Sequence, residues 1–136
     1  MTELEQLEAQ LGTFDRYAVQ EDHAKLVKAL SKPGEQMIKE ITPEEAHLLH
    51  MAVGVAGEAG ELLDAIKKQV IYRKPLDIEN VVEEIGDLFF YIQGILNSLI
   101  IDPDLCKLHN MRKLKRRYDA VYSNQAAIER ADKNDS

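Results

Sequence analysis

Residues 42–70 read TPEEAHLLHMAVGVAGEAGELLDAIKKQV, and they contain the clearest structural signal in the chain. Thr42 is followed by Pro43 and then by Glu45, which is a capping box with proline at the first helical position. Apolar residues then recur at helical spacing, at Leu48, Leu49, Met51, Val55, Leu62, Leu63, Ile66 and Val70. The pattern predicts one long helix that runs to about residue 73 and is ended by Pro75.

A second strong helix is predicted over residues 78–99, with Asp77 as its N-cap. Its apolar residues occupy more than one face, so we expect this helix to be the central and most buried element. Asp102 and Pro103 repeat the signal of a cap followed by proline, and they precede a further predicted helix over residues 105–118.

The rest of the chain carries weaker helical signals. Residues 14–30 allow a helix, residues 31–34 (SKPG) break it by their turn chemistry, and Ser123 can cap a short helix over residues 126–130. No segment has the alternation of a strand, and no internal repeat is visible. The predicted fold class is therefore all-α.

Length and composition indicate one domain. The chain has 136 residues, of which 45 % are hydrophobic and 30 % charged, as in globular proteins. We expect residues 1–136 to form a single helical domain, with residues 131–136 as a loose tail. Residues 1–12 either form a second loose tail or add a helical turn or two.

Three features favour a cytoplasmic protein without a membrane segment. The single Cys106 excludes an intramolecular disulfide and a cysteine zinc site, which fits a reducing compartment. The first residues lack the pattern of a signal peptide. The longest apolar stretch, residues 88–101, is shorter than the roughly 20 residues that span a bilayer.

The net charge is −7, from 24 acidic and 17 basic side chains. A negative field of this kind disfavours general nucleic-acid binding, so we expect no nucleic-acid partner. It also repels anionic substrates unless cations lie between the substrate and the protein.

Two pairs of carboxylates provide such a cation site. Glu58 and Glu61 are three residues apart in the first long helix, and so are Glu84 and Asp87 in the second, which puts each pair on one helix face. A short turn between antiparallel helices would set the pairs opposite each other. Four carboxylates in a partly buried groove repel strongly, and hard divalent cations such as Mg²⁺ or Mn²⁺ relieve that repulsion. A solvated acidic surface is the alternative for either pair alone.

Glycines surround these carboxylates. Gly54, Gly57, Gly60 and Gly86 lie inside predicted helices, where each costs about 0.8–1 kcal/mol relative to alanine. We expect them where a partner backbone or a ligand approaches closely.

The spacing Gly57-Glu58-x-x-Glu61, about twenty residues, and then Glu84-x-x-Asp87 resembles the signature of MazG-like all-α nucleoside triphosphate pyrophosphohydrolases, which are related to dimeric dUTPases. The similarity runs from about residue 50 to residue 132. It includes the sequence Asn110-x-x-Lys113-Leu114-x-x-Arg117-Tyr118, which is similar to the nucleotide-contacting segment of short, often phage-encoded members. Many family members have glutamate where this chain has Gly57, which leaves one fewer possible ligand.

The resemblance implies a four-helix-bundle-like, oligomeric architecture (a homodimer or homotetramer) and an Mg²⁺-dependent enzyme in which Mn²⁺ also works. It implies cleavage of (d)NTP to (d)NMP and pyrophosphate by water attack on the α-phosphorus. Phage-type relatives suggest purine deoxynucleotides such as dGTP and dATP, and a phage-encoded member would act in the host cytoplasm. The implied metal ligands are Glu58, Glu61, Glu84 and Asp87.

Glu61 is our choice for the general base, and Lys68 for the catalytic cation, because seven residues is close to two helical turns. The substrate-binding residues implied by the resemblance are Lys68, Tyr91, Asn110, Lys113, Arg117 and Tyr118. Lys68 could instead complement the helix dipole, and Tyr91 could instead be a core or interface residue. Asp64 is expected to pair with Lys67 or Lys68.

Other functions compete with the enzyme. The main alternative is a non-enzymatic helical module that forms a homo-oligomer and leaves its acidic face solvated. Ferritin-like di-iron chemistry needs two Glu-x-x-His motifs, and only Glu44-x-x-His47 is present. Nucleic-acid binding through the basic helix of residues 107–117 is a third alternative. The apolar content of so short a chain predicts self-association both for the enzyme and for the non-enzymatic helical module.

Overall fold

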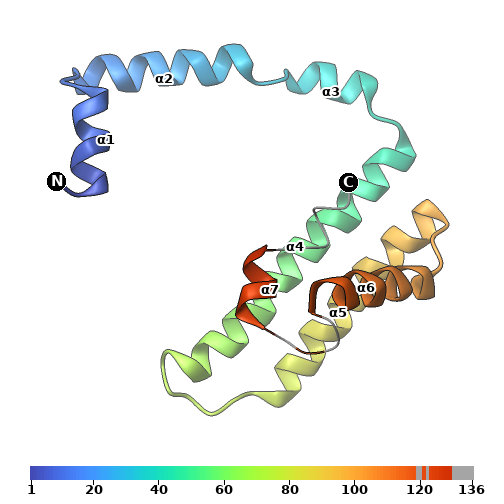
Figure 1. The fold of residues 1–136 in the computed structure, drawn as a ribbon. Coiled ribbons are helices and arrows are strands. Elements are labelled where there is room, and N and C mark those ends of the chain that lie inside the picture. Colours follow the sequence, from blue (N-terminus) through green and yellow to red (C-terminus); the bar gives the residue numbers. More distant parts are fainter. Residues whose placement is uncertain (119–120, 122, 130–136) are drawn as a thin grey trace. The chain divides into compact units, whose positions relative to one another are not determined.

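The computed structural model describes residues 1–118, 121 and 123–129, and its regular elements are helices (Figure 1). They are α1 (Glu3–Leu11), α2 (Arg16–Leu30), α3 (Gly34–Glu40), α4 (Pro43–Val70), α5 (Ile78–Leu99), α6 (Pro103–Tyr118) and α7 (Asn124–Glu129). The described ranges contain no strand, which confirms the all-α prediction. The chain divides into two compact units, Met1–Ile41 and Thr42–Ser136, and each is described by itself. The single-domain interpretation of residues 1–136 stays a prediction.

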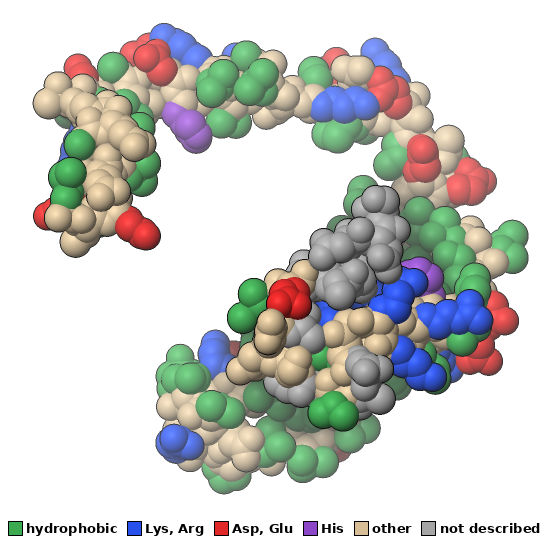
Figure 2. Space-filling model, viewed as in Figure 1, with side chains coloured by type: hydrophobic (Ala, Val, Ile, Leu, Met, Phe, Trp, Pro, Cys, Tyr) green, Lys and Arg blue, Asp and Glu red, His purple; other side chains and the backbone are tan. Residues whose placement is uncertain are grey.

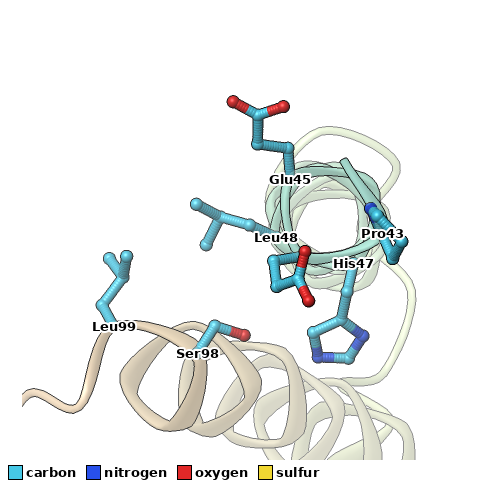
Figure 3. A pocket seen from close by; sticks show the side chains of 7 residues that line it. Pro43, Glu45, His47, Leu48, Ser98 and Leu99 are labelled. Atoms are coloured by element: carbon cyan, nitrogen blue, oxygen red, sulfur yellow. The ribbon is translucent and has the colours of Figure 1, made fainter. Parts of the chain in front are cut away.

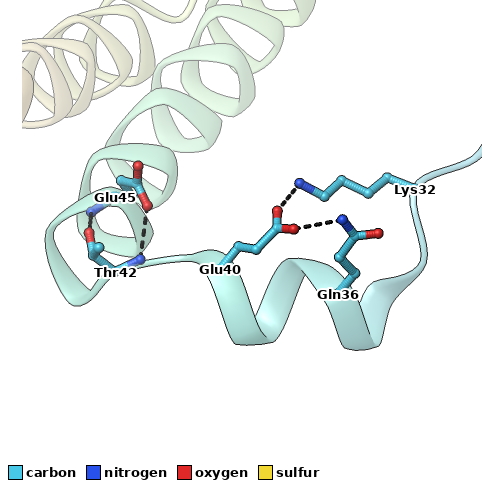
Figure 4. Close-up of polar contacts among 5 residues, drawn as sticks. All are labelled: Lys32, Gln36, Glu40, Thr42 and Glu45. Carbon is cyan, nitrogen blue, oxygen red and sulfur yellow. Dashed lines mark hydrogen bonds and ion pairs between the residues drawn. The ribbon is translucent and has the colours of Figure 1, made fainter.

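The N-terminal unit consists of three short helices without a buried residue. A capping box on Thr2 begins α1. Residues 3–11 are therefore helical, which is one of the two alternatives that the sequence left open. Helix α3 was not predicted from the sequence, because its seven residues contain too few apolar positions to show a helical period. Glu40 near its end contacts Lys32 and accepts a hydrogen bond of 2.6 Å from Gln36 (Figure 4). These contacts, Lys32 above all, lower the pKa of Glu40.

The second unit is built on a hairpin of α4 and α5, which lie side by side (Figure 1). The Thr42 hydroxyl accepts from the Glu45 N–H at 3.1 Å, and the Glu45 carboxylate accepts from the Thr42 N–H at 2.9 Å (Figure 4). Asp77 caps α5 by accepting from the Asn80 N–H at 3.0 Å. The predicted capping box of Thr42 and Glu45 and the predicted N-cap Asp77 are therefore confirmed. The C-terminus of α4 is Val70, slightly before the predicted end.

Close contacts at two glycines fix how α4 and α5 pack. The Tyr91 ring lies against Gly54, where a Cβ would come within 2.2 Å of the ring, and the Met51 sulfur lies equally close to the Cβ position of Gly94. The prediction of a close approach is confirmed for Gly54. Among the described residues, nothing lies within 4 Å of a Cβ built at Gly57, Gly60 or Gly86, so for these three the approach of a ligand or of another backbone stays a prediction.

The prediction that α5 is the most buried element is wrong for the single chain. No residue of α5 is buried, and Phe89 and Phe90 are 67 % and 66 % exposed. The buried residues of the described chain, Met51 and Ala65, belong to α4. The physical reason is that α5 packs mainly against α4, while large apolar side chains on its other faces, such as Phe89 and Phe90, stay exposed among the described residues.

A sharp turn separates α5 from α6. Ile100 adopts the left-handed conformation with φ 54°, and its side chain is 93 % exposed. The Asp102 side chain then accepts from the Asp104 N–H at 2.8 Å, as its predicted capping role requires. The short helix α7 begins two residues earlier than predicted; Arg130 and the predicted tail of residues 131–136 lie outside the described residues.

Among the described helices, none is by itself long and apolar enough to cross a membrane. Only α5 and α6 together pass that test of length and composition, as a pair bent by 103°.

The two kinds of helical glycine predict opposite effects of alanine. We expect Gly54→Ala to lower the free energy of unfolding by about 1–3 kcal/mol, because the added methyl group overlaps the Tyr91 ring. Gly60→Ala meets open space and should raise it by about 0.5–1 kcal/mol through helix propensity. Urea unfolding of both variants in EDTA measures this, and equal effects would contradict the packing described.

Candidate metal centre

Three carboxylates from the two long helices converge. Glu58 of α4 and Glu84 and Asp87 of α5 each offer an oxygen atom within 4.8 Å of the others. Glu58 and Glu84 are half-buried, whereas Asp87 is exposed. The hairpin therefore sets residues of the two predicted pairs opposite each other, and we call these three residues the carboxylate cluster.

Burial and neighbouring carboxylates both act on Glu84 in the cluster. Partial burial raises the pKa of Glu84, and the protonated Glu84 carboxyl donates a hydrogen bond to Glu58, which raises that pKa further. The negative charges of Glu58, Glu61 and Glu83 add to the effect. Neighbouring negative charges make Glu84 easier to protonate, and a nearby cation would instead stabilise its ionised form.

Glu61 lies at the edge of the cluster and is not one of its three members. Its carboxylate is exposed, and it is near enough to Glu84 and to Lys68 for its charge to raise the pKa of both. The sequence treated the four carboxylates as equivalent because helical spacing says which face a residue occupies but not how far its side chain reaches.

Lysines next to the cluster are held by Asp64. Lys67 and Lys68 lie 2.9 and 2.7 Å from the two Asp64 oxygens, so the predicted pairing is confirmed with both lysines. These contacts, that of Lys68 first, lower the pKa of Asp64 from 3.8 to about 2 and raise those of the two lysines.

Lys68 also lines a pocket of about 290 Å³ at the turn between α4 and α5. The pocket is bounded by Ala65, Lys68, Lys74, Pro75, Asp77 and Asn80. Lys74 and Asn80 were missed as candidate site residues. Lys74 follows the predicted helix, and the turn returns its backbone to Lys68, whose carbonyl accepts from the Lys74 N–H at 3.2 Å.

The donor set of the cluster fits a hard divalent cation. All three side chains supply carboxylate oxygens, which Mg²⁺ and Mn²⁺ prefer, and one protein site can hold Mg²⁺ with few carboxylates while water fills the other positions. The raised pKa of Glu84 supports this fit, because partial burial and the neighbouring carboxylates both disfavour its ionised form, which a cation would stabilise.

Comparison with known protein families identifies the family of this chain. The model of the MazG nucleotide pyrophosphohydrolase domain matches residues 46–122, more than half of the chain. The chain belongs to the MazG family. No curated protein and no solved structure matches it significantly.

The MazG domain family consists of nucleoside triphosphate pyrophosphohydrolases, which are hydrolases that act on acid anhydrides and depend on a divalent metal. The matched residues contain the whole α4–α5 hairpin except the first turn of α4, and all of α6. The carboxylate cluster is therefore part of the MazG domain, whereas α1, α2 and α3 lie outside the matched residues.

The remaining predicted residues of the MazG domain occupy two places. Tyr91 is half-buried between the helices, where it packs on Gly54 and meets His50 edge to face at 6.3 Å. This is the contact expected of a core tyrosine. On α6, Lys113, Arg117 and Tyr118 are half-buried and Asn110 is exposed, and Arg117 lies over the Tyr118 ring at 5.7 Å. A nucleotide-binding role for these residues stays a prediction.

Two other pockets lie along the MazG hairpin. One, of about 480 Å³, is at the open end of the helices, where Figure 3 shows Leu48 and His47 of α4 facing the end of α5. Its His47 lies about 16 Å along the helix from Glu58, so this pocket is separate from the cluster. The other, of about 580 Å³, contains Gly86, Phe89, Phe90 and the amide pair Gln93–Asn97, whose side chains hydrogen-bond at 2.7 Å.

We expect Asp64 to titrate with a pKa of about 2 and to return toward 3.8 in the Lys67→Met/Lys68→Met variant. Because the folded-state pKa is lowered, the stabilisation from this carboxylate is present above pH 4 and is lost as the pH falls toward 2. NMR titration of the Asp64 carboxyl carbon measures the shift. An unchanged pKa in the double variant would show that the lysines do not hold this carboxylate.

Proposed function

We propose that this MazG protein is a Mg²⁺-dependent enzyme that cleaves (d)NTP to (d)NMP and pyrophosphate, with a preference for purine deoxynucleotides such as dGTP and dATP. Membership of the family supports the reaction class. The observation that carries the proposal for this chain is the convergence of Glu58, Glu84 and Asp87 within 4.8 Å.

In this proposal the cluster holds Mg²⁺, for which Mn²⁺ can substitute, and Glu61 lies beside it as an additional ligand or as the base. When bound, the cation supplies positive charge for the triphosphate and lowers the pKa of a coordinated water. The charge of the cation would also compensate the like charges of Glu58 and Glu84, which lie in the same cluster.

Glu61 is the proposed general base. Its carboxylate is exposed at the edge of the cluster, where it can accept a proton from the attacking water. The water oxygen bonds to the α-phosphorus, the bond from that phosphorus to the bridging oxygen breaks, and pyrophosphate leaves with the electron pair. The nucleoside monophosphate keeps the oxygen of the water, so the atoms balance.

Lys68 and Lys74 are proposed to bind the phosphates that leave. Both line the pocket at the turn, and Asn80 adds an amide there. Asp64 keeps Lys68 protonated and oriented through their contact of 2.7 Å. A lysine ammonium near the breaking bond stabilises the charge that develops on the phosphate oxygens.

The nucleoside is proposed to contact Tyr91 and one side of α6. Asn110, Lys113 and Arg117 recur at spacings of three and four residues, so they occupy one side of that helix, and Tyr118 follows them. An amide can read a base edge, and cationic side chains suit phosphate oxygens.

Self-association into a homodimer or homotetramer is the second part of the proposal. Large apolar side chains remain exposed along both helices of the hairpin, among them Leu63 at 68 %, Val53 at 61 % and Phe89 at 67 %. Exposed apolar surface of this extent is typical of a subunit interface. Association through the hairpin would complete a helical bundle around the open glycines.

The activity is tested with a panel of the eight common NTPs and dNTPs. We expect Mg²⁺-dependent pyrophosphate release, most rapid with dGTP or dATP, and none in EDTA. Release of orthophosphate alone, or no product from any of the eight, would contradict the proposed reaction.

Matched variants test the roles of the carboxylates. Glu58→Gln, Glu84→Gln and Asp87→Asn should each abolish pyrophosphate release and weaken Mg²⁺ binding by more than about tenfold, because each removes a ligand oxygen. Glu61→Gln should lower kcat by about 10²–10⁴-fold with a smaller loss of binding, as expected for a base. Calorimetric Mg²⁺ titration and circular dichroism accompany the assay.

Glu83→Gln is the matched control, because Glu83 is exposed and adjacent to Glu84 but outside the cluster. It should keep its activity within a few fold of the unmodified protein. Wild-type activity in Asp87→Asn, or an equal loss in the control, would overturn the assignment of the site.

A further inference from the structure

Two helices at opposite ends of the sequence carry opposite charge. The nine residues of α1 include three glutamates and no basic residue. By contrast, α6 carries Lys107, Arg112, Lys113, Lys115, Arg116 and Arg117 against the single acidic residue Asp104. Figure 2 shows Lys and Arg side chains gathered over α6 in an otherwise acidic protein.

The charge of α1 borders an exposed apolar stripe. Leu4, Leu7 and Leu11 recur at helical spacing and are 64 %, 51 % and 68 % exposed. Glu8 lies four residues after Leu4, and Glu3 lies four residues before Leu7, so a carboxylate borders the stripe on each side. A nine-residue helix is too short to be stable by itself in water, which means that α1 needs a surface to pack on.

A matching surface runs along the outer side of α6. Leu105, Leu108 and Met111 are 61 %, 42 % and 54 % exposed. Arg112 and Lys115 follow Leu105 and Leu108 by seven residues, or two turns, so these cations share the face of the apolar residues.

The opposite side of α6 is occupied differently. Lys113 and Arg117, which the proposed function assigns to the nucleotide, are half-buried and face away from Leu105 and Leu108 by helical periodicity. The outer face can therefore bind a partner without using the residues of the proposed site.

We propose that α1 of one copy packs on the outer face of α6 of a second copy. The leucine stripe covers Leu105, Leu108 and Met111, while Glu3 and Glu8 pair with Arg112 and Lys115. No ion pair within the described residues involves any of these four charged side chains. Their charges are thus available to a second molecule.

A second copy is the occupant favoured by charge and symmetry. Each chain supplies one α1 and one α6, so a two-fold pair makes the contact twice, and the second contact forms within the complex at a high effective concentration. Nucleic acid would also meet the basic helix, but it would be repelled by a protein of net charge −7. The contact uses no residue of the carboxylate cluster and does not depend on the proposed activity.

A charge swap in the full-length protein tests the contact. We expect Glu3→Lys/Glu8→Lys and Arg112→Glu/Lys115→Glu each to weaken self-association about tenfold, from lost pairs and new repulsion. Combining all four substitutions should restore the dissociation constant to within about threefold, and raised salt should weaken the unmodified protein. Sedimentation equilibrium measures these constants. Absence of restoration, or no effect of either double variant, overturns the proposal.

A second experiment distinguishes contact between copies from contact within one chain. Leu4→Cys/Cys106→Ser and Leu108→Cys/Cys106→Ser each carry one cysteine, so a disulfide between positions 4 and 108 requires two molecules. Mixing the variants under mild oxidation should give a covalent heterodimer in excess over both homodimers. Formation of homodimers alone, or of no covalent product, would overturn the proposal. It would also be overturned if the protein did not self-associate and instead bound a short RNA or anionic vesicles with an affinity that substitutions in α1 leave unchanged.

Discussion

The close approach of α4 and α5 is the constraint on which the metal centre depends. Gly54 lets the Tyr91 ring reach the backbone of α4, and Gly94 does the same for Met51. A side chain at either glycine would separate the helices at that level. The two contacts lie three residues apart on α5, at Tyr91 and Gly94, and Glu84 lies almost three turns before Gly94 on the same helix. They therefore help to set the register that brings Glu84 and Asp87 against α4. The carboxylate cluster is thus a consequence of apolar packing further along the hairpin.

Local signals in the sequence were sufficient for the helices of this hairpin. The capping box on Thr42, the proline after it and the Asp77 N-cap depend on neighbours in the chain, and the structure reproduces them. The short helix α3 was missed because seven residues give too few apolar positions to define a period. The reach of Glu61 and the return of Lys74 to Lys68 were missed for another reason. Both depend on side-chain direction and turn geometry, which residue spacing does not encode.

Burial was the least predictable property, and the reason is physical. The period of α5 correctly indicated that several faces are apolar, but periodicity does not state which molecule covers them. Among the described residues α5 packs mainly against α4, and Phe89 and Phe90 remain exposed. The glycines without a neighbour, Gly57 and Gly60 among them, pose the same question. Each of these glycines lowers the stability of its helix relative to alanine, and no close packing against the described residues compensates for it. This is consistent with surfaces that contact another copy or the nucleotide.

The cluster also shows why an acidic protein can act on an anionic substrate. Glu84 keeps a proton more readily than an ordinary glutamate, first because it is partly buried and then because Glu58 and Glu61 lie near it with like charge. A raised folded-state pKa means that ionisation of Glu84 disfavours the folded protein as the pH rises through that value. In the proposed function, a divalent cation at the cluster would remove this penalty and reverse the local field at the same time. The like charge that adds to the raised pKa of Glu84 would then also favour binding of the cation and, through it, of a triphosphate.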